Sequence, residues 1–441
     1  MKKKFNKLNN FLFFNILLVI LFVIFFSSYK ILVTNYPLNI IYIIFLFVFL
    51  FDLIFWIFSF LNKKKKEFVL SNISLYFFLF IFNYLLSSFH GNEREVIYLE
   101  KYEKLFLKSG IYLNFRPKAV RDKNNYNYNI YPLGSIPEKK MFFCNEDLKK
   151  DLFISNDEYG FNNPASTKYF NSDIMLIGDS FTQGECVENK YNISNNLKNY
   201  YSDREILNFG MGGSGPISHL AIIREYAANF KPKNILIFIV GNNDRWDLNS
   251  EYQNKILKNY VNNKNYTQGL INKKHLITNL IDEEINQTFK NFEMINNNFL
   301  IKLKNYFKLQ KTIAYINSRI YILLNESLSR YNFELDKHVI DLIYEEKNKI
   351  NSNLFIIYLP DYYELFSKDK NYVLLRNQYI QMLNEKKIEY INFYPLFKDL
   401  IHQKNYTEKD FFVLGYSNNH YTAEIYKFIA DTIIKKNILK F

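Results

Sequence analysis

A serine follows a short apolar run in IMLIGDSFTQGECV, residues 174–187. The run at 174–177 predicts a buried strand, and the sequence Gly178-Asp179-Ser180 predicts a tight turn directly after it. Such a turn can present the serine hydroxyl as a nucleophile. A nucleophilic serine needs a general base, and it needs hydrogen-bond donors for the oxyanion that forms when it attacks a carbonyl group. The alternative is that Ser180 only caps the helix that follows.

Three other segments carry residue types that complete this chemistry. The glycine-rich stretch LNFGMGGSGP (207–216) offers backbone N–H donors, and GNND (241–244) offers the side-chain amide of Asn243. The stretch GYSNNHYT (415–422) places His420 just before an amphipathic segment. Because ligands collect at the carboxyl ends of the strands in an open parallel sheet, we expect these groups to share one rim with the serine.

Short apolar runs alternate with amphipathic segments from about residue 172 onward. The amphipathic segments, such as 216–230 and 371–387, have the helical period. The alternation predicts a three-layer α/β/α sandwich with a mainly parallel, five-stranded sheet. The predicted strands lie at 174–177, 206–208, 235–240, 354–359 and 390–393.

The first 90 residues contain three apolar spans, at about 11–27, 38–61 and 68–88. Each is close to the roughly 17 to 25 residues that cross a bilayer. The lysines at the N-terminus and at 63–66 orient the spans so that the rest of the chain is extracytoplasmic. We therefore expect residues 1–90 to be a transmembrane anchor in a lipid bilayer, the alternative for the first span being a cleaved signal peptide.

Two regions follow the predicted anchor. Residues 91–165 have few long apolar periods and predict an extracytoplasmic lead-in with turns, and residues 166–441 predict the α/β domain. Within this domain, residues at about 249–350 are rich in Asn and Lys and predict a helical insertion.

The four segments together resemble the blocks of the GDSL/SGNH hydrolase superfamily, whose name gives the block residues Ser, Gly, Asn and His. Residues 178–181 match the first block, and Gly213 matches the second, with Gly212 as the alternative register. Asn243 matches the third block and His420 the fourth. The likeness is strongest with the membrane-tethered bacterial members that are associated with surface polysaccharides.

The resemblance implies a flavodoxin-like fold and a role for each site residue. Ser180 would be the nucleophile and His420 the general base. The backbone N–H groups of Ser180 and Gly213, with the side chain of Asn243, would form the oxyanion hole. No cofactor is expected and, because the chain lacks metal-ligand spacing, no metal either.

The fourth block departs from the family pattern, which is Asp-x-x-His. Ser417 stands where the aspartate is expected, and Asn418 follows it. The Ser180–His420 pair is therefore expected to act without an acid from its own block. Its imidazole would be oriented by neutral Ser417 or Asn418, or by Asp410 further upstream. With no anion beside the imidazole, we expect activity to rise with pH around the ordinary histidine pKa of about 6.5.

The net charge and the cysteines indicate which partners the chain is expected to bind and in which compartment it is expected to lie. The charge of +13 suggests nucleic-acid binding, but eight of the lysines flank the apolar spans and the remainder are scattered, so no nucleic-acid partner is expected. Cys144 and Cys186 are the two cysteines of the chain. In an oxidising outer compartment they are expected to form a disulfide, the alternative being two unrelated buried thiols.

These observations predict a membrane-anchored serine esterase or deacetylase in a bacterial inner membrane. Its substrates would be ester groups, above all O-acetyl groups, of extracytoplasmic glycans. One alternative is an O-acyltransferase that works on a surface polysaccharide with a membrane partner supplying the acyl donor. The other alternative is a catalytically degenerate glycan-binding scaffold.

Overall fold

The computed structural model describes residues 110–112, 130–144, 151–297, 332–366, 370–413 and 420–441. These residues belong to one compact unit, made of 99–290 and 327–441, except that 291–297 belong to a second unit. The expected membrane spans lie outside the described residues. Within the described ranges, no helix is both long enough and apolar enough to cross a membrane.

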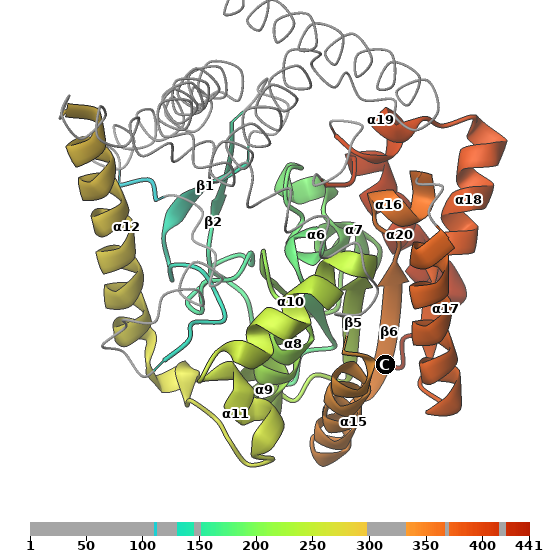
Figure 1. Ribbon diagram of the computed structural model, residues 1–441, viewed down its shortest axis with the longest axis horizontal. Helices are drawn as coiled ribbons and strands as arrows, with labels where there is room; N and C mark the ends of the chain where they lie inside the picture. The colour runs from blue at the N-terminus through green and yellow to red at the C-terminus, as the bar shows by residue number, and fades with distance from the viewer. Residues whose placement is uncertain (1–109, 113–129, 145–150, 298–331, 367–369, 414–419) are drawn as a thin grey trace, which may run out of the picture. The chain divides into compact units, whose positions relative to one another are not determined.

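Five parallel strands form the main sheet, in the order β4-β3-β5-β6-β7. This confirms the predicted fold class and all five predicted strands, with ends that differ by a few residues at most. The strands are β3 (Ile174–Gly178), β4 (Ile206–Gly210), β5 (Asn234–Val240), β6 (Asn353–Leu359) and β7 (Tyr390–Asn392). Figure 1 shows β5 and β6 side by side in this sheet.

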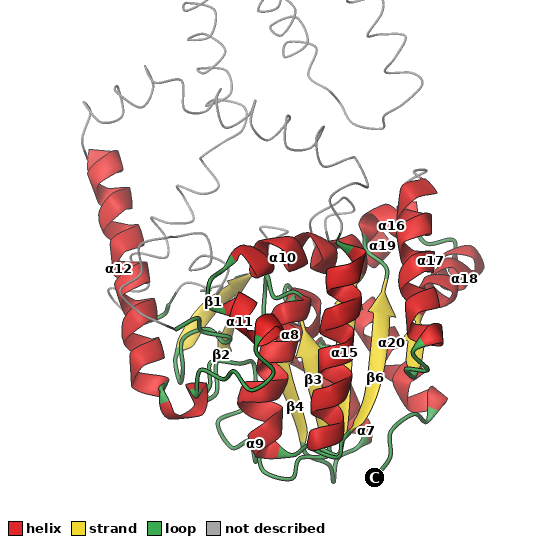
Figure 2. Cartoon of the chain, turned by 60° about the horizontal axis from the view of Figure 1, so that its bottom comes forward, coloured by secondary structure: helices red, strands yellow, loops and turns green. Residues whose placement is uncertain are grey.

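Alternate residues of each strand face opposite cores, because side chains in a strand point to opposite faces in turn. In β3, Met175 and Ile177 belong to one apolar core, and Ile174 and Leu176 belong to the other. Helices cover both faces, so the unit has three layers (Figure 2). The first core is covered by α8 (Pro216–Ile222), α15 (Phe333–Lys349) and α17 (Lys370–Glu385), and the second by α7 (Ile193–Tyr200), α18 (Phe393–Lys404) and α20 (Ala423–Lys436).

The shorter helices connect these layers or extend the ends of strands. The described part of the predicted insertion at 249–350 contains helices joined by turns and no strand. The remaining helices are α6 (Ser180–Gln183), η1 (Asn189–Tyr191), the π-helical turn η2 (Ile223–Ala227), α9 (Ala228–Phe230), α10 (Gly241–Gln253), α11 (Leu257–Asn262), η3 (Leu270–Asn272), α12 (Lys274–Asn297), α16 (Tyr362–Phe366) and α19 (Glu408–Phe411).

The lead-in contains structure that the sequence pattern did not predict. Strands β1 (Lys140–Cys144) and β2 (Leu152–Ser155) form an antiparallel pair, and Ile130 and Phe161 are buried in the first core of the α/β unit. The strands are only five and four residues long, and the buried residues are isolated in the sequence, so neither produces a clear period. The described part of the lead-in therefore packs into the same unit as the sheet.

The strand order fixes where a site can form. Order 2-1-3-4-5 is the flavodoxin-like arrangement, in which the connections reverse direction between the first and third strands. In this chain those strands are β3 and β5, which are paired side by side. Their carboxyl ends lead directly into α6 and α10, which begin at Ser180 and Gly241.

Gly210 ends β4 at the point where α6 packs against it. A Cβ atom at this position would clash with the backbone nitrogen of Gln183 and lie 2.5 Å from the carbonyl carbon of Thr182. Both atoms belong to the backbone of α6 and cannot rotate away. The helix that begins with Ser180 therefore depends on the missing side chain of Gly210.

We expect Gly210→Ala to destabilise the folded chain by about 1 to 3 kcal/mol, the usual cost of overpacking a filled interior. Urea denaturation of both proteins measures this difference. An unchanged unfolding midpoint would show that α6 moves away from β4 at no cost.

Candidate active site

Ser180 is the first residue of α6 and directly follows the turn at the end of β3. The side chain of Asp179 caps this helix, accepting a hydrogen bond from the backbone N–H of Phe181 at 2.9 Å. Gly184 ends the helix at a φ of 81° and donates its N–H to the carbonyl of Ser180. The single helical turn is thus fixed at both ends, and the hydroxyl of Ser180 lies at the carboxyl edge of the sheet.

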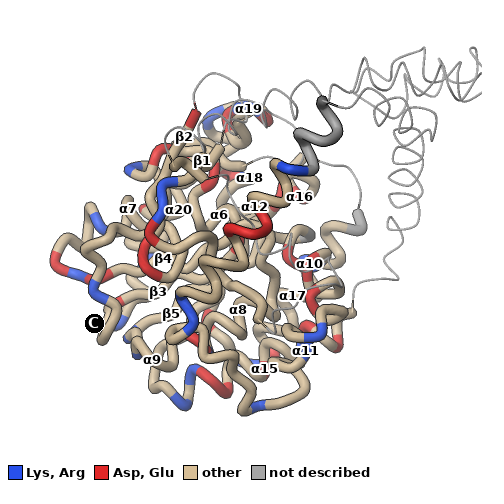
Figure 3. The backbone as a smooth tube through the Cα atoms, turned by 90° about the vertical axis from the view of Figure 1, so that its left-hand side faces the viewer, with Lys and Arg blue, Asp and Glu red and all other residues tan. Residues whose placement is uncertain are grey.

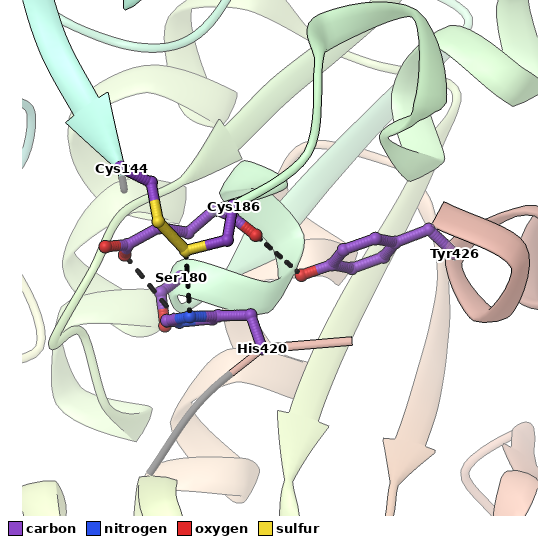
Figure 4. The surroundings of a disulfide bond; sticks show 6 residues. Cys144, Ser180, Cys186, His420 and Tyr426 are labelled. Carbon is purple, nitrogen blue, oxygen red and sulfur yellow. Dashed lines mark hydrogen bonds and ion pairs between the residues drawn. A yellow bond between two sulfur atoms is a disulfide. The ribbon is translucent and has the colours of Figure 1, made fainter. Parts of the chain in front are cut away.

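His420 lies beside this serine although 240 residues separate them in the sequence. Its Nε2 is 2.9 Å from the Oγ of Ser180 (Figure 4). Its ring centroid lies 5.0 Å from that of Phe181. The backbone carbonyl of His420 accepts a hydrogen bond from Val413, which holds the residue in place before α20. The pair has the spacing that a nucleophile and its general base require.

Gly213 and Ser180 offer the two backbone donors expected for an oxyanion hole. Between described residues, no hydrogen bond uses the N–H of either residue. By contrast, the N–H of Gly212 donates to the side chain of Gln183 at 3.1 Å. Of the two sequence registers, the structure therefore favours Gly213, which has a φ of 78°.

Asn243 is tied to the same turn. Its amide nitrogen donates to the carboxyl group of Asp179 at 2.6 Å. Because an amide nitrogen carries two hydrogens, this bond leaves the second one as a donor for a substrate oxygen.

Asp179 and Asp244 are buried carboxyl groups that tie strand ends together. Burial raises the pKa of Asp179 to about 6, although the N–H of Phe181, the charge of His420 and the amide of Asn243 oppose the shift. Asp244 accepts a hydrogen bond from the backbone N–H of Val240 at 2.9 Å. Burial, with the nearby charge of Asp179, raises its pKa well above the usual value. Neither carboxyl group is hydrogen-bonded to Ser180 in the described part of the chain.

Glu185 is a site residue that the sequence analysis missed. Its carboxylate oxygen lies 3.7 Å from the Nε2 of His420, and the residue is 4% exposed. The expectation that no anion stands beside the imidazole is therefore wrong. The one sequence signal was its position between the serine turn and Cys186, in a loop that a disulfide was expected to hold.

The residues predicted to orient the imidazole have different positions. Asp410 is exposed and accepts two hydrogen bonds from Thr407, one from the backbone N–H and one from the hydroxyl, in a capping box that begins α19. It makes no contact with His420. Ser417 and Asn418 lie outside the described residues. Within the described part of the chain, the Nδ1 atom of His420 lies 3.6 Å from the Sγ of Cys186.

A disulfide joins Cys144 at the end of β1 to Cys186 in the loop after α6 (Figure 4). The two Cα atoms are 5.1 Å apart, and the residues are separated by 42 positions. Glu185 and the two sulfur atoms lie close enough together to hold a metal ion. A metal binds the thiolate form of cysteine, however, and the disulfide removes it.

Two asparagines of the lead-in support the serine turn, and the sequence analysis gave them no role. Asn162 donates its side-chain amide to the carbonyl of Gln183 at the end of α6. Asn163 accepts from the backbone N–H of Asn208 and donates to its carbonyl, at 2.8 and 2.9 Å. A side-chain amide thus pairs with the edge strand β4 as a neighbouring strand would.

Solved structures that resemble this chain are acetyl xylan esterases and a lipolytic protein. The acetyl xylan esterase AlAXEase matches 60% of this chain and 100% of its own, at 11% identity and a TM-score of 0.36. A member of the lipolytic protein G-D-S-L family from Veillonella parvula matches 60% of this chain and 96% of its own, at 14% identity and a TM-score of 0.33. A catalytic mutant of Axe2, an acetylxylan esterase from Geobacillus stearothermophilus, matches 62% and 97%, at 12% identity and a TM-score of 0.35.

No protein-family model matches the chain, and neither does any curated protein. TM-scores below 0.5 are too low to establish a function. The function of the chain therefore has to be inferred from the arrangement of its own residues.

The disulfide can be tested directly. We expect the unfolded, unreduced chain to contain no free thiol, and reduction to release two. For a closed loop of this length, chain-entropy models give a stabilisation of about 3 to 4 kcal/mol, so reduction should also lower the melting temperature. Thiol titration in denaturant, before and after reduction, measures the first effect. Two free thiols before reduction would contradict the bridge.

Proposed function

We propose that this chain is a serine ester hydrolase of the GDSL/SGNH type. The observation that carries the proposal is the contact between Ser180 and His420, 2.9 Å apart at the carboxyl edge of a flavodoxin-like sheet. The donor groups of Gly213, in the loop after β4, and of Asn243, in the first turn of α10 after β5, support it. Acyl transfer needs a nucleophile, a base and oxyanion donors, and all three residue types meet here.

The reaction has two halves, the formation of an acyl-serine and its hydrolysis, and the same groups act in both. The Nε2 of His420 takes the proton of the Ser180 hydroxyl while Oγ attacks the ester carbonyl. The resulting oxyanion accepts hydrogen bonds from the N–H groups of Ser180 and Gly213 and from the amide of Asn243. His420 then gives its proton to the leaving alcohol, which leaves an acyl-serine. In the second half a water molecule gives a proton to His420 and attacks the acyl carbonyl. His420 then returns this proton to the Oγ of Ser180 as the bond between Oγ and the acyl carbon breaks, which releases the carboxylic acid and restores the serine.

An O-acetylated glycan is the substrate that we propose. Trp246 is 53% exposed and stands three positions after Asn243 on α10, so the two residues are neighbours on the helix surface. Its flat apolar ring suits the C–H face of a sugar. Basic and acidic residues are interspersed along the described chain, which supports a neutral substrate (Figure 3).

The proposal places the enzyme at the outer face of a bacterial inner membrane. The disulfide supports an oxidising compartment, because cytosolic thiols are kept reduced. The three apolar spans at 11–27, 38–61 and 68–88 would be the anchor. An acyltransferase remains the second candidate only if a membrane partner supplies the acyl group.

Ser180→Ala should abolish hydrolysis of p-nitrophenyl acetate and of acetylated sugars, and it should abolish covalent labelling by a fluorophosphonate ester. The melting temperature should change little, since a hydroxyl at the rim of the sheet contributes little packing. The test uses the full-length chain and follows the release of acetate.

Retained turnover in Ser180→Ala would remove the serine from the mechanism. Absence of both turnover and labelling in the wild type would favour the glycan-binding scaffold. Acetyl transfer to an added sugar, in place of acetate release, would favour the acyltransferase.

The location can be tested by fusing a reporter after residue 441 and another within residues 62–67. We expect the first to be extracytoplasmic and the second cytoplasmic, because three crossings separate the N-terminus from the α/β unit. Two reporters on the same side would contradict a third crossing.

A further inference from the structure

We propose that Glu185 stabilises the positive charge that His420 acquires when it takes the proton of Ser180. This inference rests on the proposed esterase function and names one more residue of its mechanism. In an Asp-x-x-His block, the aspartate supplies a negative charge at the Nδ1 edge of the imidazole. Here Glu185, in the loop after α6, would supply that charge at the Nε2 edge.

The loop holds Glu185 firmly against the imidazole. Its backbone N–H donates to the carbonyl of Ser180 at 3.0 Å, and its own carbonyl accepts from the hydroxyl of Tyr426 on α20 at 3.4 Å. Gly184 before it and Cys186 after it both have positive φ, at 81° and 71°. This conformation is uncommon for a residue other than glycine, and the disulfide from Cys186 to β1 helps to hold it.

The geometry suits a charge interaction better than a hydrogen bond. The 3.7 Å between the carboxylate of Glu185 and the Nε2 of His420 is too long for a hydrogen bond but is within the range of an ion pair. In the tautomer that acts as the base, Nε2 accepts the hydrogen of the Ser180 hydroxyl across 2.9 Å. Once that proton moves to Nε2, a positive charge faces the carboxylate in a buried site, where screening by water is weak.

Among the residues that the structure describes, the other groups near His420 differ from this carboxylate in position or charge. Asp179, on the turn after β3, acts on His420 at longer range and is engaged by Phe181 and Asn243. Tyr421 is fully buried, and its pKa is raised well above the usual value by burial, so it stays neutral. On the Nδ1 side, Cys186 presents a disulfide sulfur that carries no charge.

The negative charge proposed for Glu185 determines the direction in which the acid limb of the rate profile should move when the residue is replaced. A neighbouring anion favours the protonated imidazole, so a higher pH is needed to produce the neutral base. Removing the anion should therefore move the acid limb of the rate profile to lower pH. It should also lower the rate on the plateau, because the imidazolium that forms in the transition state loses its partner.

The experiment compares kcat/KM for p-nitrophenyl acetate from about pH 5 to 9 in full-length wild type, Glu185→Gln and Glu185→Asp. In Glu185→Gln we expect a plateau about ten- to a hundredfold lower and an acid limb shifted to lower pH. Glu185→Asp, which keeps the charge at a greater distance, should lie between the two. The matched control is Glu188→Gln in the same loop, whose side chain is 39% exposed and pairs with Lys190. It should keep the wild-type profile.

Two results would overturn the role of Glu185. One is an unchanged plateau and limb in Glu185→Gln. The other is a loss of activity in both variants with an unmoved limb, which would make the residue structural. If Glu185→Gln melts well below the wild type, the acid limb of the Glu185→Asp rate profile decides whether Glu185 acts through its charge or only supports the structure. Ser180→Ala, assayed alongside, separates this inference from the function itself: if it retains activity the esterase proposal fails, whereas an inactive Ser180→Ala with an unmoved limb overturns only Glu185.

Discussion

Asp179 brings a carboxyl group into the interior at the end of β3, with no exposure to solvent. Burying such a group is costly unless hydrogen bonds replace those of water. Its donors are the backbone N–H of Phe181, in the first turn of α6, and the side chain of Asn243, in the first turn of α10. The same carboxyl group therefore links the ends of β3 and β5. The direction of Ser180 and the position of Asn243 both depend on it.

The imidazole of His420 depends on a second constraint, the loop between Gly184 and the disulfide. Glu185 lies at its Nε2 edge, and the sulfur of Cys186 lies at its Nδ1 edge. Because Cys144 belongs to β1, this arrangement ties the lead-in to the reacting groups. A segment whose sequence shows little periodicity thus contributes directly to the geometry of the site.

Residues that lie at strand ends could be predicted from the sequence, since apolar runs fix the strands and parallel strands bring their carboxyl ends together. Ser180, Asn243 and the glycine-rich stretch 207–216 were predicted to share one rim in this way, whereas Gly213 within that stretch was chosen from the family resemblance. Glu185 was not predicted, because its role depends on two left-handed residues and a disulfide that have no sequence period. The hairpin of β1 and β2 and the packing of Ile130 were missed because short strands and single apolar residues give no pattern.

A carboxylate at Nε2 does not do everything that one at Nδ1 does. An acceptor at Nδ1 fixes the tautomer with Nε2 unprotonated, ready to receive the serine proton, and it also stabilises the imidazolium. A carboxylate at Nε2 supplies only the second effect. Control of the tautomer belongs to the Nδ1 side, where the described part of the chain places the disulfide sulfur of Cys186 at 3.6 Å. If Glu185 acts as proposed, this chain separates charge stabilisation from tautomer control.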